Sequence, residues 1–226
     1  MQTAVYRVID LCAGNFSGRT LRRVFVPLIL VSYFGGLALA IWMYPGTFDW
    51  RTRSMSKLLY PANNPQYHAI GSVGVAVAGL LTIPLAASVG KRLRVTSPVA
   101  AAAGALAFIF GAISLILCAV IVSSMHERLA RGAGIFFGLG MLAFYVSCLE
   151  QRAPRRLFVA WSLIVLPALA ILALRVLAAI HFRWASPIYR TIENRALWHL
   201  GFWEWIGSAA VFLFLMSAAF FLPDNE

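Results

Sequence analysis

Several long apolar segments with few charges constrain this chain more than any other feature of its sequence. Each is about 20 residues long, which is the length that a helix needs to cross the about 30 Å hydrocarbon core of a bilayer. None of them alternates apolar and polar residues as a membrane-spanning strand does. Because backbone groups inside a bilayer must be hydrogen-bonded within the chain, we expect these segments to be transmembrane helices. The six expected spans are residues 24–44, 67–89, 99–122, 132–149, 158–180 and 201–222.

The composition excludes a water-soluble domain. Hydrophobic residues make up 61% of the 226-residue chain and charged residues 12%, whereas soluble domains are about 45–50% apolar and about 25% charged. The net charge of +11 would suggest nucleic-acid binding in a soluble protein. Here most basic residues flank the expected spans, and no basic face carries aromatic stacking platforms. We therefore predict no nucleic-acid partner, and membrane lipids as the main partner.

The order of the segments predicts one transmembrane unit with short flanks. In residues 1–23 apolar side chains fall on one helical face and polar ones on the other, which is typical of a cytoplasmic helix lying in the membrane interface. No clear cleavage site precedes a soluble domain, so we expect residues 24–222 to stay in the membrane as a six-helix bundle. Residues 223–226 form an acidic cytoplasmic tail. The predicted fold class is an all-α integral membrane protein with six transmembrane helices and a short N-terminal interfacial helix.

The distribution of positive charge predicts which end of the bundle faces the cytoplasm. Six spans put both termini on one side, and the N-terminal segment and short loops on that side carry ten lysines and arginines. The opposite loops carry eight, spread over longer segments that also contain acids. Because cytoplasmic loops are enriched in positive charge, we predict a multi-pass protein of the cell (inner) membrane with cytoplasmic N- and C-termini. Tryptophans and tyrosines, Trp50 and Trp205 among them, cluster at the outer boundary as an aromatic belt does.

Glycines recur inside the second, third and fourth spans. Gly74, Gly104 and Gly111 are expected to let neighbouring helices approach closely. The pair Gly134-x-x-x-Gly138 is typical of helix packing within a chain and also of helix dimers. A homo-oligomer or a partner within a membrane complex therefore stays open. The three cysteines lie far apart, so we predict neither a disulfide framework nor a thiol metal site.

Charged and hydroxyl side chains gather at the expected outer ends of the spans. They come from the loop 45–66 and from the starts of the fourth and sixth spans. Arginine side chains at such a place bind anionic groups, and a carboxylate or an imidazole moves a proton. We therefore predict a headgroup or ligand site, whose residues are Arg51, Arg53, Ser54, His126, Arg128 and Glu204. If the site is catalytic, the candidates for proton transfer are His126, Glu204 and Asp49.

The same residues also have a structural interpretation. Interhelical salt bridges and side chains that extend to the interface can fix the loops of a membrane protein. Glu204 lies about one turn inside the sixth span, where a lipid-facing carboxylate is costly, so we expect it to face the bundle or a wet cavity. Arg175, inside the fifth span, is expected to extend outward or to pair with Glu204. The sequence leaves both interpretations open.

The four histidines also fall at or near the outer ends of the expected spans. Neutral imidazole is a common zinc ligand, and a catalytic zinc takes three protein ligands and an open position. No H-x-x-x-H or H-E-x-x-H pair, however, presents two ligands on one helical face. We therefore predict no metal and no other cofactor, and keep a zinc site on His68, His126 and His199 as the alternative.

Short motifs in the first outer loop and the second span carry a family resemblance; these are Phe48-Asp49-Trp50, the segment 54–58, Asn64-Pro65, Gly71-x-x-Gly74 and Gly79-Leu-Leu-x-x-Pro84. They resemble the same part of the six-span bacterial "domain of unknown function 998" membrane proteins and, more distantly, the DRAM/FRAG superfamily. His126, followed by small residues at the start of the fourth span, is similar to the pattern of those groups. The resemblance implies the six-helix layout. The bacterial family has no assigned chemistry, and the eukaryotic relatives imply roles in membrane lipid organisation or trafficking.

Three functions fit these features. The leading interpretation is a non-enzymatic, lipid-associated membrane protein with an outward-facing headgroup or ligand site. The first alternative is a membrane-embedded hydrolase or transferase, with or without zinc, that uses the outer histidine, glutamate and arginine side chains. The second is a small subunit of a larger membrane complex. The sequence contains neither a G-x-x-x-x-G-K-[ST] loop nor a G-x-S-x-G motif. It therefore supports neither nucleotide binding through a phosphate loop nor a serine hydrolase.

Overall fold

The computed structural model describes residue 10 and residues 13–50, 53–95, 97–121, 125–149, 154–179 and 200–222. Within these residues the regular secondary structure is helical and contains no strand. The elements in chain order are α2 (Gly18–Thr20), η1 (Leu21–Phe25), α3 (Val26–Leu30), η2 (Val31–Gly35), α4 (Gly36–Trp42), α5 (Ser56–Leu59), α6 (His68–Leu93), α7 (Pro98–Val120), α8 (His126–Leu149), α9 (Arg155–Ala179) and α11 (Leu200–Phe221).

Five of the described helices are long and apolar enough to cross a membrane. They are Gly18–Trp42, His68–Leu93, Pro98–Val120, His126–Leu149 and Gly201–Phe221, with mean hydropathies between 1.7 and 2.5. The expectation of an all-helical fold is confirmed for the described residues, five of whose helices are candidates to span a membrane by length and composition. The expected fifth span falls on α9, a helix of 25 residues, in which the side chains of residues 172 and 174–179 lie outside the described part.

The first long helix begins earlier than its expected start at residue 24. It runs without a break from Gly18 through α2, η1, α3, η2 and α4, and the hydroxyl of Ser17 caps its first turn by accepting a hydrogen bond from the Thr20 N–H at 3.2 Å. The π-helical turn η1 ends at Phe25, two residues before Pro27, whose ring nitrogen has no hydrogen to donate to the helix. Residues 18–23, expected in the interfacial helix, therefore belong to the first long helix.

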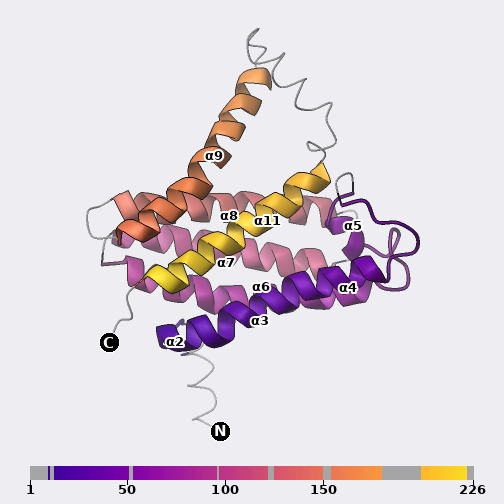
Figure 1. The fold of residues 1–226 in the computed structure, drawn as a ribbon, viewed down its shortest axis with the longest axis horizontal. Helices are drawn as coiled ribbons and strands as arrows, with labels where there is room; N and C mark the ends of the chain where they lie inside the picture. The colour runs from indigo at the N-terminus through magenta and orange to yellow at the C-terminus, as the bar shows by residue number, and fades with distance from the viewer. Residues whose placement is uncertain are drawn as a thin grey trace.

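Helices α6, α7 and α8 lie side by side, and α4 and α11 cross one face of this layer (Figure 1). Aromatic rings fill the centre. Phe108, Phe144, Trp161 and Phe214, from four helices, are fully buried and stack with centroid separations of 4.0–6.2 Å. The indole N–H of Trp161 donates to the Phe214 carbonyl oxygen at 3.0 Å, so α9 is fixed to α11 through its first half. The second half of α9 tilts away from the other helices (Figure 1).

Helices α7 and α8 are antiparallel neighbours joined by glycine and phenylalanine residues in register. At each contact a glycine on one helix faces a phenylalanine ring on the other, and a Cβ on that glycine would lie only 2.4–2.7 Å from a ring carbon. The pairs are Gly104 with Phe144, Gly140 with Phe108 and Gly111 with Phe137. The close approach expected at Gly104 and Gly111 is confirmed. By contrast, a Cβ on Gly134 or Gly138 would meet no described atom within 4 Å.

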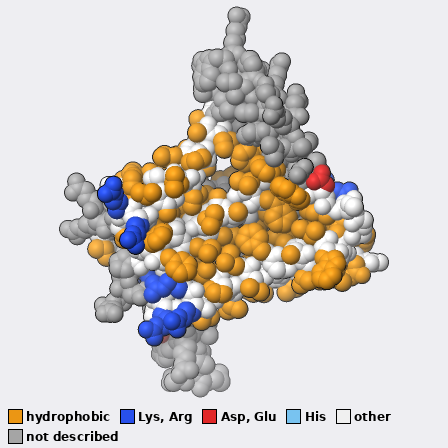
Figure 2. All heavy atoms as spheres, in the orientation of Figure 1, with side chains coloured by type: hydrophobic (Ala, Val, Ile, Leu, Met, Phe, Trp, Pro, Cys, Tyr) orange, Lys and Arg blue, Asp and Glu red, His pale blue; other side chains and the backbone are white. Residues whose placement is uncertain are grey.

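The two ends of the bundle differ in charge. At the end where α2 begins and α6 stops, the described charged residues are Arg19, Arg22, Arg23, Lys91, Arg92, Arg94, Arg155, Arg156 and the single acid Asp10. At the opposite end they are Arg53, Lys57, Arg128 and Arg131 with the acids Asp49, Glu127 and Glu204. Figure 2 shows most of the lysines and arginines of this face at one end, and an apolar band between the two ends. We call the first the basic end and the second, which the loop between α4 and α6 covers, the capped end.

Candidate functional site at the capped end

The loop between α4 and α6 folds back over the helix ends and is anchored by the short helix α5. Met55, Leu58 and Leu59 are spaced as one apolar helical face, and all three are buried. The carbonyl oxygens that end α5 have side-chain donors, because the Asn64 amide donates to Leu58 O at 3.2 Å and the Ser72 hydroxyl to Leu59 O at 3.4 Å. The sequence therefore folds this loop into a fixed cap.

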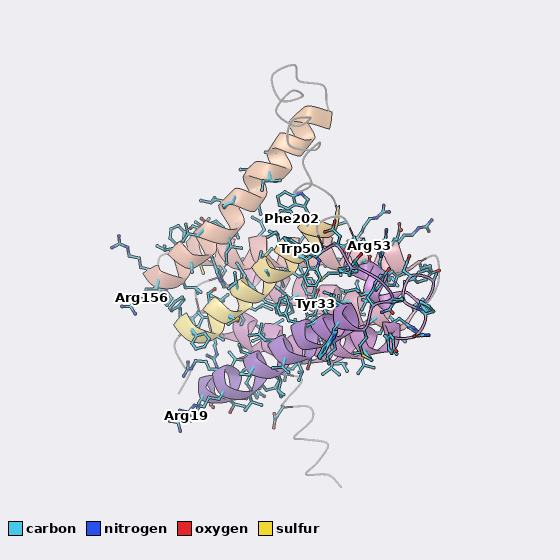
Figure 3. The ribbon with its side chains drawn as sticks, turned by 45° about the vertical axis from the view of Figure 1, so that its right-hand side comes forward. Arg19, Tyr33, Trp50, Arg53, Arg156 and Phe202 are labelled. Carbon is cyan, nitrogen blue, oxygen red and sulfur yellow. The ribbon has the colours of Figure 1, made fainter. Side chains whose placement is uncertain are left out.

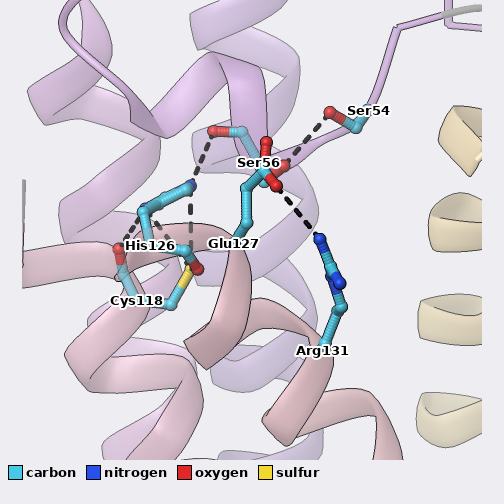
Figure 4. Close-up of polar contacts among 6 residues, drawn as sticks. All are labelled: Ser54, Ser56, Cys118, His126, Glu127 and Arg131. Atoms are coloured by element: carbon cyan, nitrogen blue, oxygen red, sulfur yellow. Dashed lines mark hydrogen bonds and ion pairs between the residues drawn. The ribbon is translucent and has the colours of Figure 1, made fainter. Parts of the chain in front are cut away.

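His126, the first residue of α8, connects the cap to the helices beneath it (Figure 4). Its Nε2 lies 3.0 Å from Ser56 O on α5, and its Nδ1 lies 2.9 Å from Cys118 O near the end of α7. The neutral ring has one N–H and donates to one of these oxygens, whereas the imidazolium donates to both. The ring is 6% exposed and stacks obliquely on Tyr60 at 5.7 Å between centroids. His126 thus holds α5, α7 and α8 together.

Glu204 holds the same peptide unit from the other side. Its Oε2 accepts a hydrogen bond from the Ser56 N–H at 3.3 Å, so a carboxylate of α11 caps the first turn of α5. Ser56 is therefore bound through its N–H by Glu204 and through its C=O by His126. We call these three residues the Ser56 clamp. His126 and Glu204 both contact the backbone of Ser56. This agrees with the structural interpretation of these residues, in which they fix the loops of the protein.

Cys118 and His126 form a buried thiol–imidazole pair. The Cys118 Sγ lies 3.5 Å from His126 Nδ1, and such a pair is the usual arrangement for an activated nucleophile. Both side chains are buried, however, with 3% and 6% of their surface exposed. In this conformation the pair fixes the loop and offers no surface to a substrate.

Arg53 lies at the edge of the cap, beside the start of α11. Its Nη1 donates to the Tyr44 hydroxyl at 2.8 Å, and its guanidinium carbon lies 5.3 Å from the centre of the Tyr44 ring. Both partners are uncharged, and no ion pair of Arg53 is found within the described part of the chain. A Cβ on Gly201 would lie 2.3 Å from Arg53 O, so only glycine lets the loop backbone rest on α11. The buried Ser54 hydroxyl accepts a hydrogen bond from the Ser56 hydroxyl at 3.1 Å.

The other sequence-predicted residues are further from the clamp or undescribed. Asp49 and Arg128 are exposed. The Glu127 carboxylate pairs with Arg131 at 3.1 Å on the surface of α8, with 76% and 72% of these side chains exposed (Figure 4). The structure thus brings Ser54, His126 and Glu204 together around one loop.

Arg51 and His199 lie outside the described residues, and so does the side chain of Arg175, so its expected pairing with Glu204 stays a prediction. His68 begins α6. Among residues that the structure describes, no three histidine, cysteine, aspartate or glutamate side chains lie close enough together to hold a metal ion.

An apolar groove opens beside the cap, between the first long helix and α11. Its volume is about 420 Å³, and its lining is almost entirely apolar. The lining residues are Phe34, Ile41, Phe48, Trp50, Trp205, Ile206 and Ala209. Trp50 packs near Phe202 with 6.1 Å between centroids, and both lie close to Arg53 (Figure 3). The sequence analysis assigned Trp50 and Trp205 to an aromatic belt at the membrane boundary. It did not predict that both residues line a groove.

Trp205 combines an apolar ring with an unsatisfied donor in the wall of the groove. Its Nε1 is buried, and no acceptor for this N–H exists among the described residues. Gly201, Trp205 and Ala209 recur every four residues, so they share one face of α11. Because Gly201 touches the backbone of Arg53, this face runs from the cap into the groove. The sequence analysis missed this spacing, which marks a shared helical face but does not by itself indicate a groove.

Comparisons with protein-family models, with curated protein sequences and with solved structures find no match for this chain. The resemblance to the bacterial six-span proteins therefore stays a prediction that rests on the short motifs alone.

Proposed function

We propose that this chain is a six-helix integral membrane protein that binds a membrane lipid at the capped end of its bundle. The observation that carries the proposal is the apolar groove of about 420 Å³, whose lining residues Phe48 and Trp50 belong to the same loop as Arg53. This volume lies in the range of about 300–1,000 Å³ that is typical of small-molecule sites. A lipid supplies both parts of a matching ligand, since its chain is apolar and its headgroup carries an anion.

The six-span layout is supported by α9. This helix is long enough to cross a bilayer, and its buried residues Leu157, Trp161 and Val165 pack on the bundle. Many apolar side chains of the other helices are exposed on the band between the two ends (Figure 2). Such a wide apolar surface suits lipid tails rather than water. The start of α2 and the end of α11 both lie at the basic end, which supports chain termini on one side of the membrane.

The orientation is supported by the charge at the two ends. The basic end carries eight described lysines and arginines, counted from Arg19 to Arg156, against one described acid. The capped end carries four against three. Because positive charge marks cytoplasmic loops, the basic end faces the cytoplasm and the capped end faces outward across the cell membrane. The groove then opens to the outer leaflet.

The lipid-binding interpretation is favoured over an enzyme because the polar residues at the capped end already have structural partners. His126 and Glu204 both bind the backbone of Ser56. Arg53 contacts only uncharged groups of Tyr44 in the described structure, so its positive charge is available to an anionic headgroup. The protein then acts by holding or organising a lipid without transforming it.

Native mass spectrometry of the full chain, released from detergent, tests the proposal. We expect the wild type to retain phospholipid, and Ala209→Phe to lose it because the added ring fills the groove. Ala103→Phe is the matched control, since Ala103 is exposed on α7 and does not line the groove. Lipid retained equally by both variants, or no lipid on the wild type, would contradict lipid binding in the groove.

A further inference from the structure

We infer that the groove takes an ester-linked phospholipid in a defined pose: its phosphate binds Arg53, its ester carbonyl accepts the Trp205 N–H, and its acyl chain extends toward Phe34 and Ala209. The inference rests on the proposed function, because it requires that the groove holds a lipid. It adds the chemical class of that lipid and the residues that recognise it.

The order of groups along α11 matches the order of groups along a phospholipid. Gly201 lies against the backbone of Arg53, Trp205 follows one turn deeper, and Ala209 lies one further turn into the groove. Four residues of helix rise about 6 Å. The headgroup layer on each side of a bilayer is about 5–8 Å thick. A phosphate at Arg53 therefore places the ester group at the depth of Trp205 and the hydrocarbon chain beside Ala209.

The buried Nε1–H of Trp205 has no hydrogen-bond acceptor in the described part of the chain. A buried N–H without a partner is destabilising, and native structures rarely leave one unpaired. The groove lining is almost entirely apolar, so a hydrocarbon chain alone would not satisfy this donor. An ester carbonyl does so after a rotation of the indole about its Cβ–Cγ bond turns the N–H toward the ligand. This requirement distinguishes an acyl ester from an alkyl chain.

Arg53 supplies the complementary charge at the other end of the same face. The Tyr44 hydroxyl and ring fix the guanidinium without neutralising it. A guanidinium presents several N–H donors in one plane and binds phosphate oxygens in pairs. The tyrosine ring packs edge-on against Phe48, with 5.3 Å between centroids, and Phe48 lines the groove. Tyr44 thus links the cation to Phe48, a lining residue of the groove.

The test compares two phospholipids that differ only in linkage. Native mass spectrometry titrates the detergent-purified full chain with diacyl phosphatidylglycerol and with its dialkyl ether counterpart. Because the loss of one hydrogen bond is the only difference, we expect the wild type to bind the ester form about fivefold more tightly. Trp205→Phe is expected to bind both forms equally, with the affinity that the wild type shows for the ether. Trp42→Phe, at an exposed tryptophan of α4 outside the groove lining, is the matched control and is expected to keep the ester preference.

Arg53→Gln separates the headgroup from the chain. We expect this variant to bind both lipids about tenfold more weakly, since a charge-assisted contact is lost, and to keep the ester preference. Excess inorganic phosphate is expected not to displace the lipid, and displacement would show that Arg53 is an anion site without a lipid pose.

Equal binding of ester and ether by the wild type overturns the inference without any variant, so a Trp205→Phe protein that fails to fold leaves it testable. An ester preference that survives in a folded Trp205→Phe protein overturns it as well. If neither lipid binds the wild type, the proposed function itself fails, and that outcome is distinct from equal binding of the two.

Discussion

At the scale of single residues, the capped end depends on one peptide unit bound from two sides. Ser56 donates its N–H to Glu204, and its C=O lies 3.0 Å from Nε2 of His126. These partners are 148 and 70 residues away in the sequence, so the loop is fixed by helices that form independently of it. Each partner satisfies a backbone group of α5 that its single turn leaves unpaired. The stability of the cap should therefore depend on acceptor and donor chemistry at these positions more than on their charge.

The exchange of Glu204 tests this dependence. We expect Glu204→Gln to be tolerated, because the amide oxygen still accepts the Ser56 N–H. We expect Glu204→Leu to lower the free energy of unfolding by about 1–3 kcal/mol, because that N–H is left buried without an acceptor. Thermal unfolding of the detergent-purified protein measures the difference.

Glu127→Leu provides the control for this pair. Glu127 is exposed and, among the described residues, pairs with Arg131 on the helix surface, so its loss should change stability by no more than about 0.5 kcal/mol. Equal destabilisation by the glutamine and leucine variants of Glu204 would show that its contact with Ser56 does not support the cap.

At the scale of helices, α7 and α8 show how this bundle obtains close packing from small residues. Each glycine at their contact receives an aromatic ring from the other helix, so the two backbones approach while the rings fill the remaining space. Within a membrane, apolar surface gains little from leaving lipid, and packing of this kind stabilises helix pairs. The glycines at the contact are therefore sites where even one methyl group is too large.

Two alanine substitutions on α8 compare a glycine that packs against α7, Gly140, with one that has no described atom close to it, Gly134. Gly140→Ala places a Cβ 2.6 Å from a ring carbon of Phe108, and we expect overpacking to cost about 1–3 kcal/mol. Gly134→Ala meets no described atom within 4 Å, and alanine is the better helix former by about 1 kcal/mol. Melting temperatures should move in opposite directions, and a loss of stability in Gly134→Ala would indicate a partner against that position.

At the scale of the whole molecule, charge distinguishes the two ends of the bundle while the apolar band between them is nearly uniform. Figure 3 places Arg19 and Arg156 at one end and Arg53 with Trp50 at the other. The arginines of the basic end also make structural contacts, as when Arg22 donates to the Ala219 carbonyl at 3.4 Å near the end of α11. Such a contact complements the helix dipole and satisfies a carbonyl that the helix leaves unpaired.

Cysteine labelling in intact cells tests the orientation. Arg128→Cys at the capped end should react with a membrane-impermeant maleimide, whereas Arg156→Cys at the basic end should react only after permeabilisation. Both arginines are exposed, so reactivity reports the side of the membrane. The background carries Cys12→Ser; Cys118 and Cys148 are buried. The reverse pattern of labelling would place the groove in the inner leaflet.

The sequence by itself determined the class of fold and the chemical difference between the ends. A run of about 20 apolar residues has the same consequence in any context, because its backbone must be hydrogen-bonded as a helix wherever water is excluded. The sequence pattern also predicted close helix packing at Gly104 and Gly111, and the structure confirms it. The sequence analysis did not predict that the first long helix begins at Gly18, although Ser17 is a residue type that favours the N-cap position.

Only the tertiary structure decided which polar residues meet and where the surface is hollow. Gly134 and Gly138 form the most familiar packing motif in the chain, yet no described atom lies close to either. His126 and Glu204 were expected near each other, but their shared partner Ser56 came from the docking of α5. The groove lies between the first long helix and α11, which are far apart in the sequence, and the loop between α4 and α6 contributes Phe48 and Trp50 to its lining. Hydropathy is a property of each segment alone, whereas these contacts depend on how distant segments pack, and no local pattern encodes that.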